Sequence, residues 1–339
     1  MLAAALILAD LWLLGRTQAA ETYSGYLSLR YQEGMVPEES FDQLMDSEEA
    51  KKLASAAVWK NHGRKEISAE QTGRKQQADC YSIKGQPEAV FGKTLQSGRY
   101  FLSSETDVCL LDQKTSIALF GVKDASGNVI QTGGKTYRIT GILSGEEAVC
   151  MIPAEKGSTF DGISVQRKTD SKSVQSIVSM MEVYLGGSHK EIIDGQFYSA
   201  TAKIIFAVSQ AMLCAALCTA AGVYAKKTRK PAVLSRCLVA AGWIMLLVIV
   251  ILGIMFSGLG RDYLPTYWSD FEFFSSLWKT KTEAVRQFAA FQQFWPEQEL
   301  YNNWRLVMGG GAAMTAVAAI GTLYGIVGIR QYRTGQTQI

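Results

Sequence analysis

The sequence predicts a helical membrane bundle joined to a mixed α+β domain outside the membrane. We expect four transmembrane spans, the first one short, with the domain between spans 1 and 2. Two observations carry this prediction. The 339 residues include 34 basic and 31 acidic side chains, or 19% charged, against roughly 25% in soluble proteins. This shortage of charge is confined to three long runs, whereas residues 20–200 have an ordinary soluble composition.

The three runs contain no Asp, Glu, Lys or Arg. They are residues 204–225, 237–257 and 306–329. An α-helix rises about 1.5 Å per residue, so about 20 apolar residues cross the roughly 30 Å of a bilayer's hydrocarbon core. Each run has this length, has basic residues near both ends and lacks proline. We therefore expect three transmembrane helices in a lipid bilayer, because three helices that are apolar on every face do not fit one small soluble domain.

The basic residues also predict the orientation of these spans. Residues 226–236 contain five basic and no acidic side chains: Lys226, Lys227, Arg229, Lys230 and Arg236. Residues 258–305 are balanced, with five basic and six acidic side chains. Because positive residues favour cytoplasmic loops, we expect 226–236 and the tail 330–339 in the cytoplasm and 258–305 outside. Everything before Ile204 is then extracytoplasmic.

The amino terminus leaves two interpretations open. Leu2–Leu14 is apolar except for Asp10 and would reach only about 20 Å as a helix. One interpretation is a first span within residues 1–16 whose beginning is missing. The other is a signal peptide that ends near Ala19. We favour the first, because a signal peptide opens with positive residues and this chain opens with Met-Leu.

Residues 20–200 have the pattern of a mixed α/β unit. Ser40 and Gln43 have the spacing of a helix capping box, and we expect a helix from there through Trp59. Short apolar runs between Gly, Asp and Asn turns predict strands. These strands are residues 78–83, 107–111, 135–143 and 148–152. A second helix is expected over Ser173–Leu185, because its apolar residues recur on one face and a Gly-Gly pair follows it.

Two short motifs resemble the end of a phosphate-binding loop: Gly133–Thr136 and Gly92–Thr94. The complete motif is Gly, four residues, then Gly-Lys-Ser/Thr at the start of a helix. Here the preceding glycine stands seven residues upstream rather than five, and the first motif precedes a predicted strand. We interpret both motifs as turns and expect no nucleotide site.

The six cysteines divide equally between the two parts of the chain. Cys80, Cys109 and Cys150 fall in predicted strands, where a disulfide can form among them in an oxidising compartment. The sequence does not choose the pair. Cys214 and Cys218 share one face of a predicted span with small residues, which is typical of a helix contact rather than a metal site.

Composition predicts no enzyme and no cofactor. The two histidines lie far apart in the sequence, so no metal centre and no Ser-His-Asp or Cys-His arrangement is expected. A net charge of +3 excludes a generally basic nucleic-acid binder.

Two further patterns concern the carboxyl-terminal part. Ala313, Val317, Gly321 and Gly325 recur every four residues in the last span and predict a helix-packing face, within one chain or between two. Residues 258–305 contain thirteen aromatic side chains. These fit an aromatic belt at the membrane interface or, alternatively, amphipathic helices on the outer leaflet.

An ordered series of motifs spans residues 95–143. Gly98-Arg-Tyr-Phe101 precedes an apolar strand at 107–111, Leu119-Phe-Gly121, a glycine hairpin and the strand Tyr137–Ile142. This series resembles the extracytoplasmic core domain of MacB-type ABC transporter permeases, relatives of the macrolide exporter and of lipoprotein-releasing systems. The order of spans and outer segments extends the resemblance to an FtsX-like transmembrane region.

The resemblance implies a function. Such permeases dimerise, and a separate cytoplasmic ATPase drives motions of the spans that reach the outer domains. We therefore expect a multi-pass permease subunit of the cell membrane, partnered by an ATPase and by a second copy or paralogue. The basic residues of 226–236 would face the ATPase. This segment is shorter than its counterpart in the family and contains Pro231, so a non-transporting, membrane-anchored binding or sensory module is the alternative.

Overall fold

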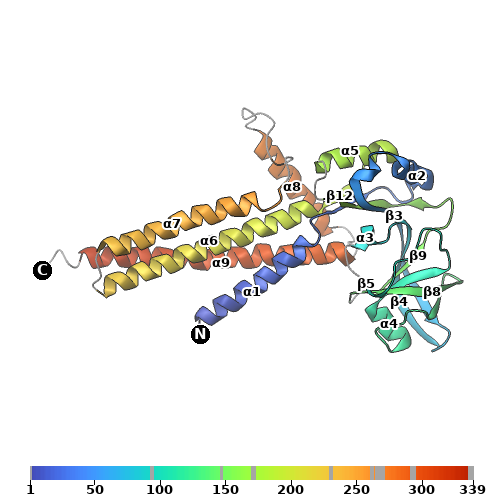
Figure 1. Ribbon diagram of the computed structural model, residues 1–339, viewed down its shortest axis with the longest axis horizontal. Helices are drawn as coiled ribbons and strands as arrows, with labels where there is room; N and C mark the ends of the chain where they lie inside the picture. The colour runs from blue at the N-terminus through green and yellow to red at the C-terminus, as the bar shows by residue number, and fades with distance from the viewer. Residues whose placement is uncertain are drawn as a thin grey trace. The chain divides into compact units, whose positions relative to one another are not determined.

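The computed structural model of the chain forms two compact units. It describes residues 2–91, 95–145, 148–168, 173–228, 232–259, 263, 272–290 and 295–334. The helical unit comprises residues 1–24, 195–259 and 299–339, and the sheet unit comprises residues 25–194 and 260–298. Figure 1 shows the elements of both units.

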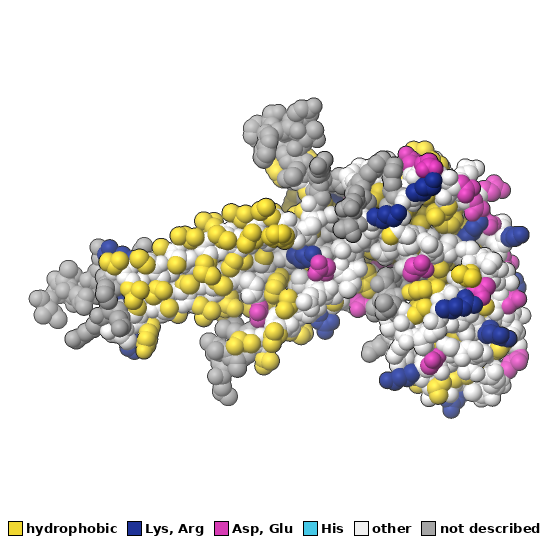
Figure 2. All heavy atoms as spheres, viewed as in Figure 1, with side chains coloured by type: hydrophobic (Ala, Val, Ile, Leu, Met, Phe, Trp, Pro, Cys, Tyr) yellow, Lys and Arg dark blue, Asp and Glu magenta, His cyan; other side chains and the backbone are white. Residues whose placement is uncertain are grey.

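Four helices occupy the described part of the helical unit. They are α1 (Leu2–Glu21), α6 (Gly195–Lys227), α7 (Ala232–Met255) and α9 (Trp295–Thr334), whose first residues belong to the sheet unit. Among the described residues, three stretches are long and apolar enough to cross a membrane: Gly195–Lys227, Val233–Met255 and Glu297–Val327. Hydrophobic side chains gather over the long helices in Figure 2, whereas charged side chains are scattered over the sheet unit. The three predicted charge-free helices are confirmed, and α1 as a fourth span stays a prediction.

Small residues bring α6 and α7 together. A Cβ added to Gly242 of α7 would lie 2.7 Å from the Cβ of Cys218 in α6. A Cβ added to Gly222 of α6 would lie 3.1 Å from the carbonyl oxygen of Ser235 in α7. Such residues let helix backbones approach closely in a membrane, and the helix contact predicted for Cys218 is confirmed.

A ten-stranded mixed sheet forms the centre of the sheet unit. Nine strands follow the order β12-β1-β11-β3-β4-β9-β6-β8-β5, and β7 pairs with β3 and β8. The pairs β4–β9 and β6–β8 are parallel. The strands are β1 (Tyr26–Arg30), β3 (Leu53–Ala69), β4 (Arg74–Gly85), β5 (Leu95–Gly98), β6 (Val108–Asp112), β7 (Val129–Thr132), β8 (Lys135–Leu143), β9 (Val149–Pro153), β11 (Gly162–Arg167) and β12 (Glu191–Asp194). A separate pair joins β2 (Val36–Pro37) to β10 (Thr159–Phe160).

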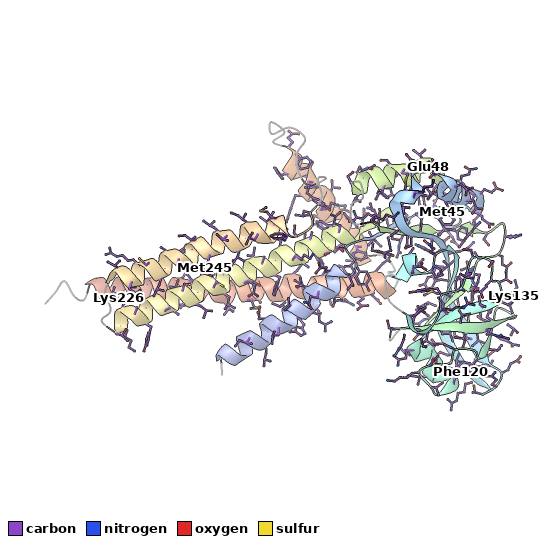
Figure 3. All side chains as sticks on the ribbon, in the orientation of Figure 1. Met45, Glu48, Phe120, Lys135, Lys226 and Met245 are labelled. Carbon is purple, nitrogen blue, oxygen red and sulfur yellow. The ribbon has the colours of Figure 1, made fainter. Side chains whose placement is uncertain are left out.

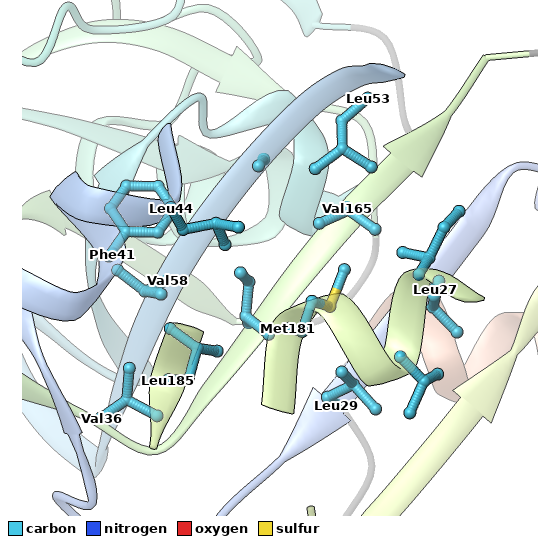
Figure 4. Close-up of a cluster of buried hydrophobic side chains, with 14 of the residues drawn as sticks. Leu27, Leu29, Val36, Phe41, Leu44, Leu53, Val58, Val165, Met181 and Leu185 are labelled. Carbon is cyan, nitrogen blue, oxygen red and sulfur yellow. The ribbon is translucent and has the colours of Figure 1, made fainter. Parts of the chain in front are cut away.

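Helices cover the sheet over separate apolar clusters. The helices of this unit are α2 (Glu38–Asp46), α3 (Glu88–Phe91), α4 (Gln113–Phe120), α5 (Val174–Leu185) and α8 (Phe273–Ala290), with a 3₁₀ turn at Ala50–Lys52. Figure 4 shows Phe41 and Leu44 of α2 and Met181 of α5 packed with side chains of β1, β3 and β11. Each large side chain buried there stabilises the fold by about 1.5–3 kcal/mol. Further clusters lie around β4, β6, β8 and β9.

Several local predictions are confirmed. The helix expected over Ser173–Leu185 is α5, where the Ser173 hydroxyl accepts a hydrogen bond from the Ser176 amide at 3.1 Å. This helix ends at Gly186, whose φ of 76° suits glycine. The predicted strands appear within β4, β6, β8 and β9. Gly133 and Gly134 form the turn between β7 and β8 with positive φ, whereas residues 92–94 lie outside the described residues.

The helix expected from Ser40 through Trp59 is wrong. Helix α2 begins at Glu38 after Pro37 and ends at Asp46, so Ser40 lies inside it rather than at its cap. Residues 53–69 form the long strand β3 instead. Residues 55–59 are all buried, because neighbours cover both faces of this strand. A strand that is buried on both faces does not show the apolar–polar alternation by which strands are recognised. The spacing of its alanines is also compatible with one face of a helix.

A larger residue at Gly242 is expected to weaken the helical unit. Gly242→Val places side-chain atoms where Cys218 already lies, and such overpacking costs about 1–3 kcal/mol. The thermal unfolding midpoint of the full chain in detergent should fall. Gly309→Val is the matched control, because a Cβ there meets nothing within 4 Å. Equal midpoints for the two variants would contradict the close α6–α7 contact.

Candidate functional site

A fully buried carboxylate stands in the first turn of α9. Glu297 has an exposed fraction of 0% and forms an ion pair with Arg30 at the end of β1. Tyr26, at the start of the same strand, donates its hydroxyl to Oε1 of Glu297 at 3.3 Å. Residues 26 and 30 lie on one face of the strand because side chains alternate between faces. One face of β1 therefore offers a cation and a hydroxyl to a single carboxylate.

Further buried polar groups support this pair. The Tyr26 hydroxyl lies 3.3 Å from Oγ of Ser164, which accepts a hydrogen bond from Nε1 of Trp59 at 3.0 Å. Ser164 in turn donates to Oγ of Ser28 at 3.1 Å. The Arg30 guanidinium lies 5.7 Å from the centre of the Trp59 ring. Burial, followed by the charge of Glu297, raises the pKa of Tyr26, so its hydroxyl stays protonated as a donor.

This network attaches a candidate span to the sheet. Helix α9 continues from Glu297 into a stretch that is apolar enough to cross a membrane. Removing one partner of a buried ion pair costs about 3–5 kcal/mol, because the other charge is left uncompensated. A carboxylate in the first turn is also favoured by the helix dipole. The start of α9 is therefore held to β1 by an ion pair and a hydrogen bond.

A second carboxylate stands just before α6. Asp194 is the last residue of β12, and α6 begins at the next residue. The hydroxyl of Tyr263 donates to Oδ2 of Asp194 at 3.0 Å. The ammonium of Lys281 in α8 lies 3.6 Å from the same oxygen and 5.1 Å from the centre of the Tyr263 ring. The segment 258–305 therefore neutralises the carboxylate at the start of α6.

Helix α8 bears on the two interpretations of the aromatic segment. It is an 18-residue helix that buries Phe288. On its exposed surface lie Phe274 and Trp278, the latter 75% exposed. The structure thus contains a helix whose aromatic side chains are exposed near its start and buried near its end. Its position at a membrane surface stays a prediction.

Polar contacts join α1 to the other helices of the helical unit. Asp10, the charge within the apolar start of the chain, accepts a hydrogen bond from Gln210 of α6. Glu21 pairs with Lys203 of α6 at 2.6 Å. Arg16 donates to Asn303 of α9 at 3.1 Å. Helix α1 is therefore part of the bundle, and its only acidic side chain within the apolar stretch has a partner.

The predicted packing face of α9 divides into two parts. A Cβ on Gly325 would lie 2.7 Å from Cγ2 of Thr219 in α6, so this glycine contacts α6 closely. Nothing lies within 4 Å of a Cβ on Gly321, Val317 is 58% exposed, and Ala313 is exposed. The residues of α9 that are buried against this chain each follow a predicted position by one residue; they are Met314, Ala318 and Thr322. Contact through Ala313, Val317 and Gly321 stays a prediction that concerns another chain.

The basic segment is described only at its ends. Lys226 and Lys227 end α6, and Arg236 lies near the start of α7. Lys226 is labelled in Figure 3, and Lys227 and Arg236 are exposed. Arg229 and Lys230 lie outside the described residues. The role of the segment toward an ATPase stays a prediction.

The three cysteines of the sheet unit lie in one apolar cluster. Cys80 and Cys150 are register partners on the parallel strands β4 and β9, and Cys109 lies on β6. All three are buried free thiols. The neighbouring thiol of Cys150, followed by burial, raises the pKa of Cys80, so this sulfur is a poor nucleophile. The structure contains no disulfide among them, and their pairing stays a prediction.

Comparison with known proteins decides the family. Residues 9–184 match the family model of the MacB-like periplasmic core domain. The chain belongs to this family. The matched region contains the motif series at residues 95–143, so the resemblance inferred there is confirmed. With its three span-capable helices, this MacB-like chain is a multi-pass membrane protein with a large extracytoplasmic domain and a permease-type role.

Two solved structures have a weak likeness to this chain. The periplasmic region of MacB from Actinobacillus actinomycetemcomitans is 16% identical, with a TM-score of 0.44 over 52% of this chain and 92% of that one. The extracellular domain of the noncanonic ABC-type transporter YknZ from Gram-positive bacteria is 16% identical, with a TM-score of 0.39 over 48% and 92%. No curated protein sequence matches this chain.

Sequence reasoning missed the two carboxylates of this MacB-like chain. Glu297 precedes a charge-free run, and an acidic residue there signals a helix start. Asp194 precedes another run in the same way. Local sequence patterns could not identify the partners of these carboxylates, because Arg30 lies 267 positions away from Glu297.

Loss of the buried carboxylate is expected to loosen the start of α9. Glu297→Ala leaves Arg30 uncompensated and should cost about 3–5 kcal/mol in local opening. Hydrogen–deuterium exchange of the full chain should then be faster in residues 26–30 and 297–303. The double variant Arg30→Met with Glu297→Leu should recover most of the protection, because no buried charge is left.

The control for this change is an exposed ion pair of the same unit. Lys75 and Glu66 pair at 2.7 Å with both side chains at least half exposed, and such pairs contribute about 0–1 kcal/mol. Lys75→Met should leave exchange in the two segments unchanged. Equal effects of Glu297→Ala and Lys75→Met would show that the buried pair does not hold α9.

Proposed function

We propose that the chain is the transmembrane permease subunit of an ABC-type export or mechanotransmission system that works with a separate cytoplasmic ATPase. The observation that carries the proposal is that the MacB-like domain leads directly into a span-capable helix along the chain. Strand β12 ends at Asp194 and α6 begins at Gly195. Helix α9 is fixed to β1 through Glu297.

These attachments suit the transmission of movement. A displacement of α9 along its axis would act first on Glu297, whose partners Arg30 and Tyr26 belong to one strand. That strand pairs with both β11 and β12, and β12 leads into α6. Helix α6 thus follows β12 directly in the chain, and α9 is paired with the adjacent strand β1. A movement of one helix relative to the other would therefore strain the sheet.

The ATPase partner is the finer part of the proposal. The sequence contains no complete phosphate-binding loop, so ATP hydrolysis would fall to another subunit. In the FtsX-like arrangement that we propose, the segment 226–236 faces that subunit. Exposed basic side chains at Lys227 and Arg236 suit an acidic surface on the partner.

Neutralising the basic segment is expected to release the ATPase. In the test variant the five basic residues of 226–236 become Gln, and the full chain is purified in mild detergent from cells that contain the candidate ATPase. The wild type should retain an ATPase that the variant loses. Lys279→Gln with Arg286→Gln, in α8, is the control with neutralised charges outside that segment.

The alternative function is a membrane-anchored binding or sensory module that does not transport. The short basic segment with Pro231 favours it, because it leaves little chain for docking. This alternative predicts no ATPase in either purification. An ATPase retained equally by wild type and variant would instead place the docking surface elsewhere. A tag at residue 339, accessible from the cytoplasm in both proteins, verifies the orientation.

A second copy or paralogue is the other proposed partner. Ala313, Val317 and Gly321 form a surface of small side chains on α9 that the described chain leaves exposed. Membrane helices associate through such surfaces. In this proposal the face predicted from the sequence packs between two chains.

A bulky residue at Gly321 is expected to reduce dimer formation. Gly321→Leu fills a surface that is open within one chain, so folding should be unaffected while a second helix is excluded. The measurement is the mass distribution of the full chain in lipid nanodiscs. Ala312→Leu is the control, because residue 312 is exposed and lies about 180° from Gly321 around the helix. A dimer fraction that is equal in the two variants would exclude this face.

A further inference from the structure

The sheet unit contains a cleft that the proposed function does not use. Its volume is about 530 Å³, within the roughly 300–1,000 Å³ typical of small-molecule sites. Strand β3 changes register against β4 between Asn61 and Arg64, and the cleft lies beside this irregularity. Its walls come from β3, β4, the β7–β8 turn and the segment that follows β9.

The floor of the cleft carries hydroxyl groups. Ser82 of β4 and Tyr137 of β8 are each 6% exposed and line the cleft. The Ser82 hydroxyl lies 2.9 Å from Nε2 of His62. Within the described ranges the Tyr137 hydroxyl has no hydrogen-bond partner in the protein. A hydroxyl without a protein partner, on a residue that lines a cleft, is available as a donor to a ligand.

The charged side chains that line the cleft are three lysines and Glu155. Lys60 and Lys65 of β3 and Lys135 of β8 line it, and Lys135 is labelled in Figure 3. Lys135 forms an ion pair with Glu155. Neither Lys60 nor Lys65 pairs with a carboxylate among the residues that the structure describes.

The state of His62 agrees with this charge. Burial, followed by the charge of Lys60, lowers its pKa, and Lys65 acts in the same direction. Asp161 and Glu155 oppose them. Asp161 already accepts hydrogen bonds from the amides of Gly34 and Asn61 at 2.9 Å. Lys60 and Lys65 therefore line the cleft without an ion-pair partner among the described residues, beside the hydroxyls of Ser82 and Tyr137.

We propose that this cleft binds a small molecule through an anionic group, a phosphate or a carboxylate. Lys60 and Lys65 supply the positive charge, and the Tyr137 hydroxyl donates a hydrogen bond to the anion. The Ser82 hydroxyl donates to it as well when Nε2 of His62 carries the ring proton and donates to Ser82. Hydrogen bonds to charged groups are the stronger kind, and an anion is what this set of donors lacks. The site lies entirely in the sheet unit, so it does not rest on coupling to an ATPase.

The test is calorimetric titration of the full chain in a zwitterionic detergent. Inorganic pyrophosphate is the phosphate probe, citrate is the carboxylate probe, and sodium chloride at matched ionic strength is the blank. Saturable binding of either probe is expected, and the stronger one identifies the anionic group. The proposal would be overturned if neither probe saturated the protein up to about 10 mM, which corresponds to a binding free energy weaker than roughly −3 kcal/mol.

Variants locate the binding in the cleft. The double variant Lys60→Gln with Lys65→Gln should bind the probe with about tenfold or more lower affinity, because two charge-assisted contacts are lost. Lys114→Gln with Lys123→Gln, on and after α4, is the control and should bind as the wild type does. Tyr137→Phe keeps the buried ring and should weaken binding by about threefold to tenfold. Unchanged affinity in both cleft variants would place the anion elsewhere and overturn the proposal, whatever the result with the ATPase.

Discussion

The ion pair between Glu297 and Arg30 constrains segments from both ends of the sequence. A carboxylate with no exposed surface loses its hydration and must be paired. Its pairing requires that Arg30 and Tyr26 point to the same side of β1. A slip of one residue in the pairing of β1 with β11 or β12 would turn both side chains to the opposite face. The charge at the start of α9 therefore fixes the register of a strand at the other end of the sequence.

The two units are stabilised in different ways because they have different solvents. In the sheet unit, large apolar side chains such as Phe41, Leu44 and Met181 leave water on folding, and this transfer supplies most of the stability. In the helical unit, apolar side chains gain little by leaving lipid, so close approach of backbones matters more. The glycines of α6 and α7 serve this approach, while the large side chains of α7 such as Trp243 and Ile244 remain on its surface.

The sequence was sufficient to predict a helix or strand where one local pattern determines that element. The charge-free runs predicted the long helices because only length and composition matter for a span. The helix α5 was predictable because its cap, its apolar face and its terminal glycine agree. Strand β3 was not, because a strand covered on both faces lacks the alternation by which strands are recognised. Its residues Ala56 and Ala57 are compatible with either structure until neighbours are known.

The sites could not be predicted because their parts come from distant segments. Glu297 is paired with a residue at the opposite end of the sequence, and the cleft collects His62, Ser82 and Tyr137 from three strands. Nothing in the residues around Lys60 distinguishes it from a solvated lysine. Only the sheet topology, which places β4 beside β3 and connects β3 to β8 through β7, brings these groups to one cleft. The packing face expected at Ala313, Val317 and Gly321 stays a prediction, and the residues that α9 buries within the chain, Met314, Ala318 and Thr322, each follow one of these positions by one residue.

The two helices that follow segments predicted to be extracytoplasmic both begin beside a carboxylate that is paired with a cation. Asp194 stands immediately before α6 and Glu297 in the first turn of α9, and each is paired with a tyrosine hydroxyl and a cation. A helix that starts outside the bilayer exposes the positive end of its dipole there, and a carboxylate is its natural complement. The carboxylate in turn needs a cation once it is buried, so the sheet and α8 supply Arg30 and Lys281. Helix α7 starts at the predicted cytoplasmic side and carries Arg236 near its start instead, in agreement with the rule that basic residues remain inside. The same electrostatic requirement thus accounts for the orientation predicted from the loops and for the polar contacts by which the domain holds its helices.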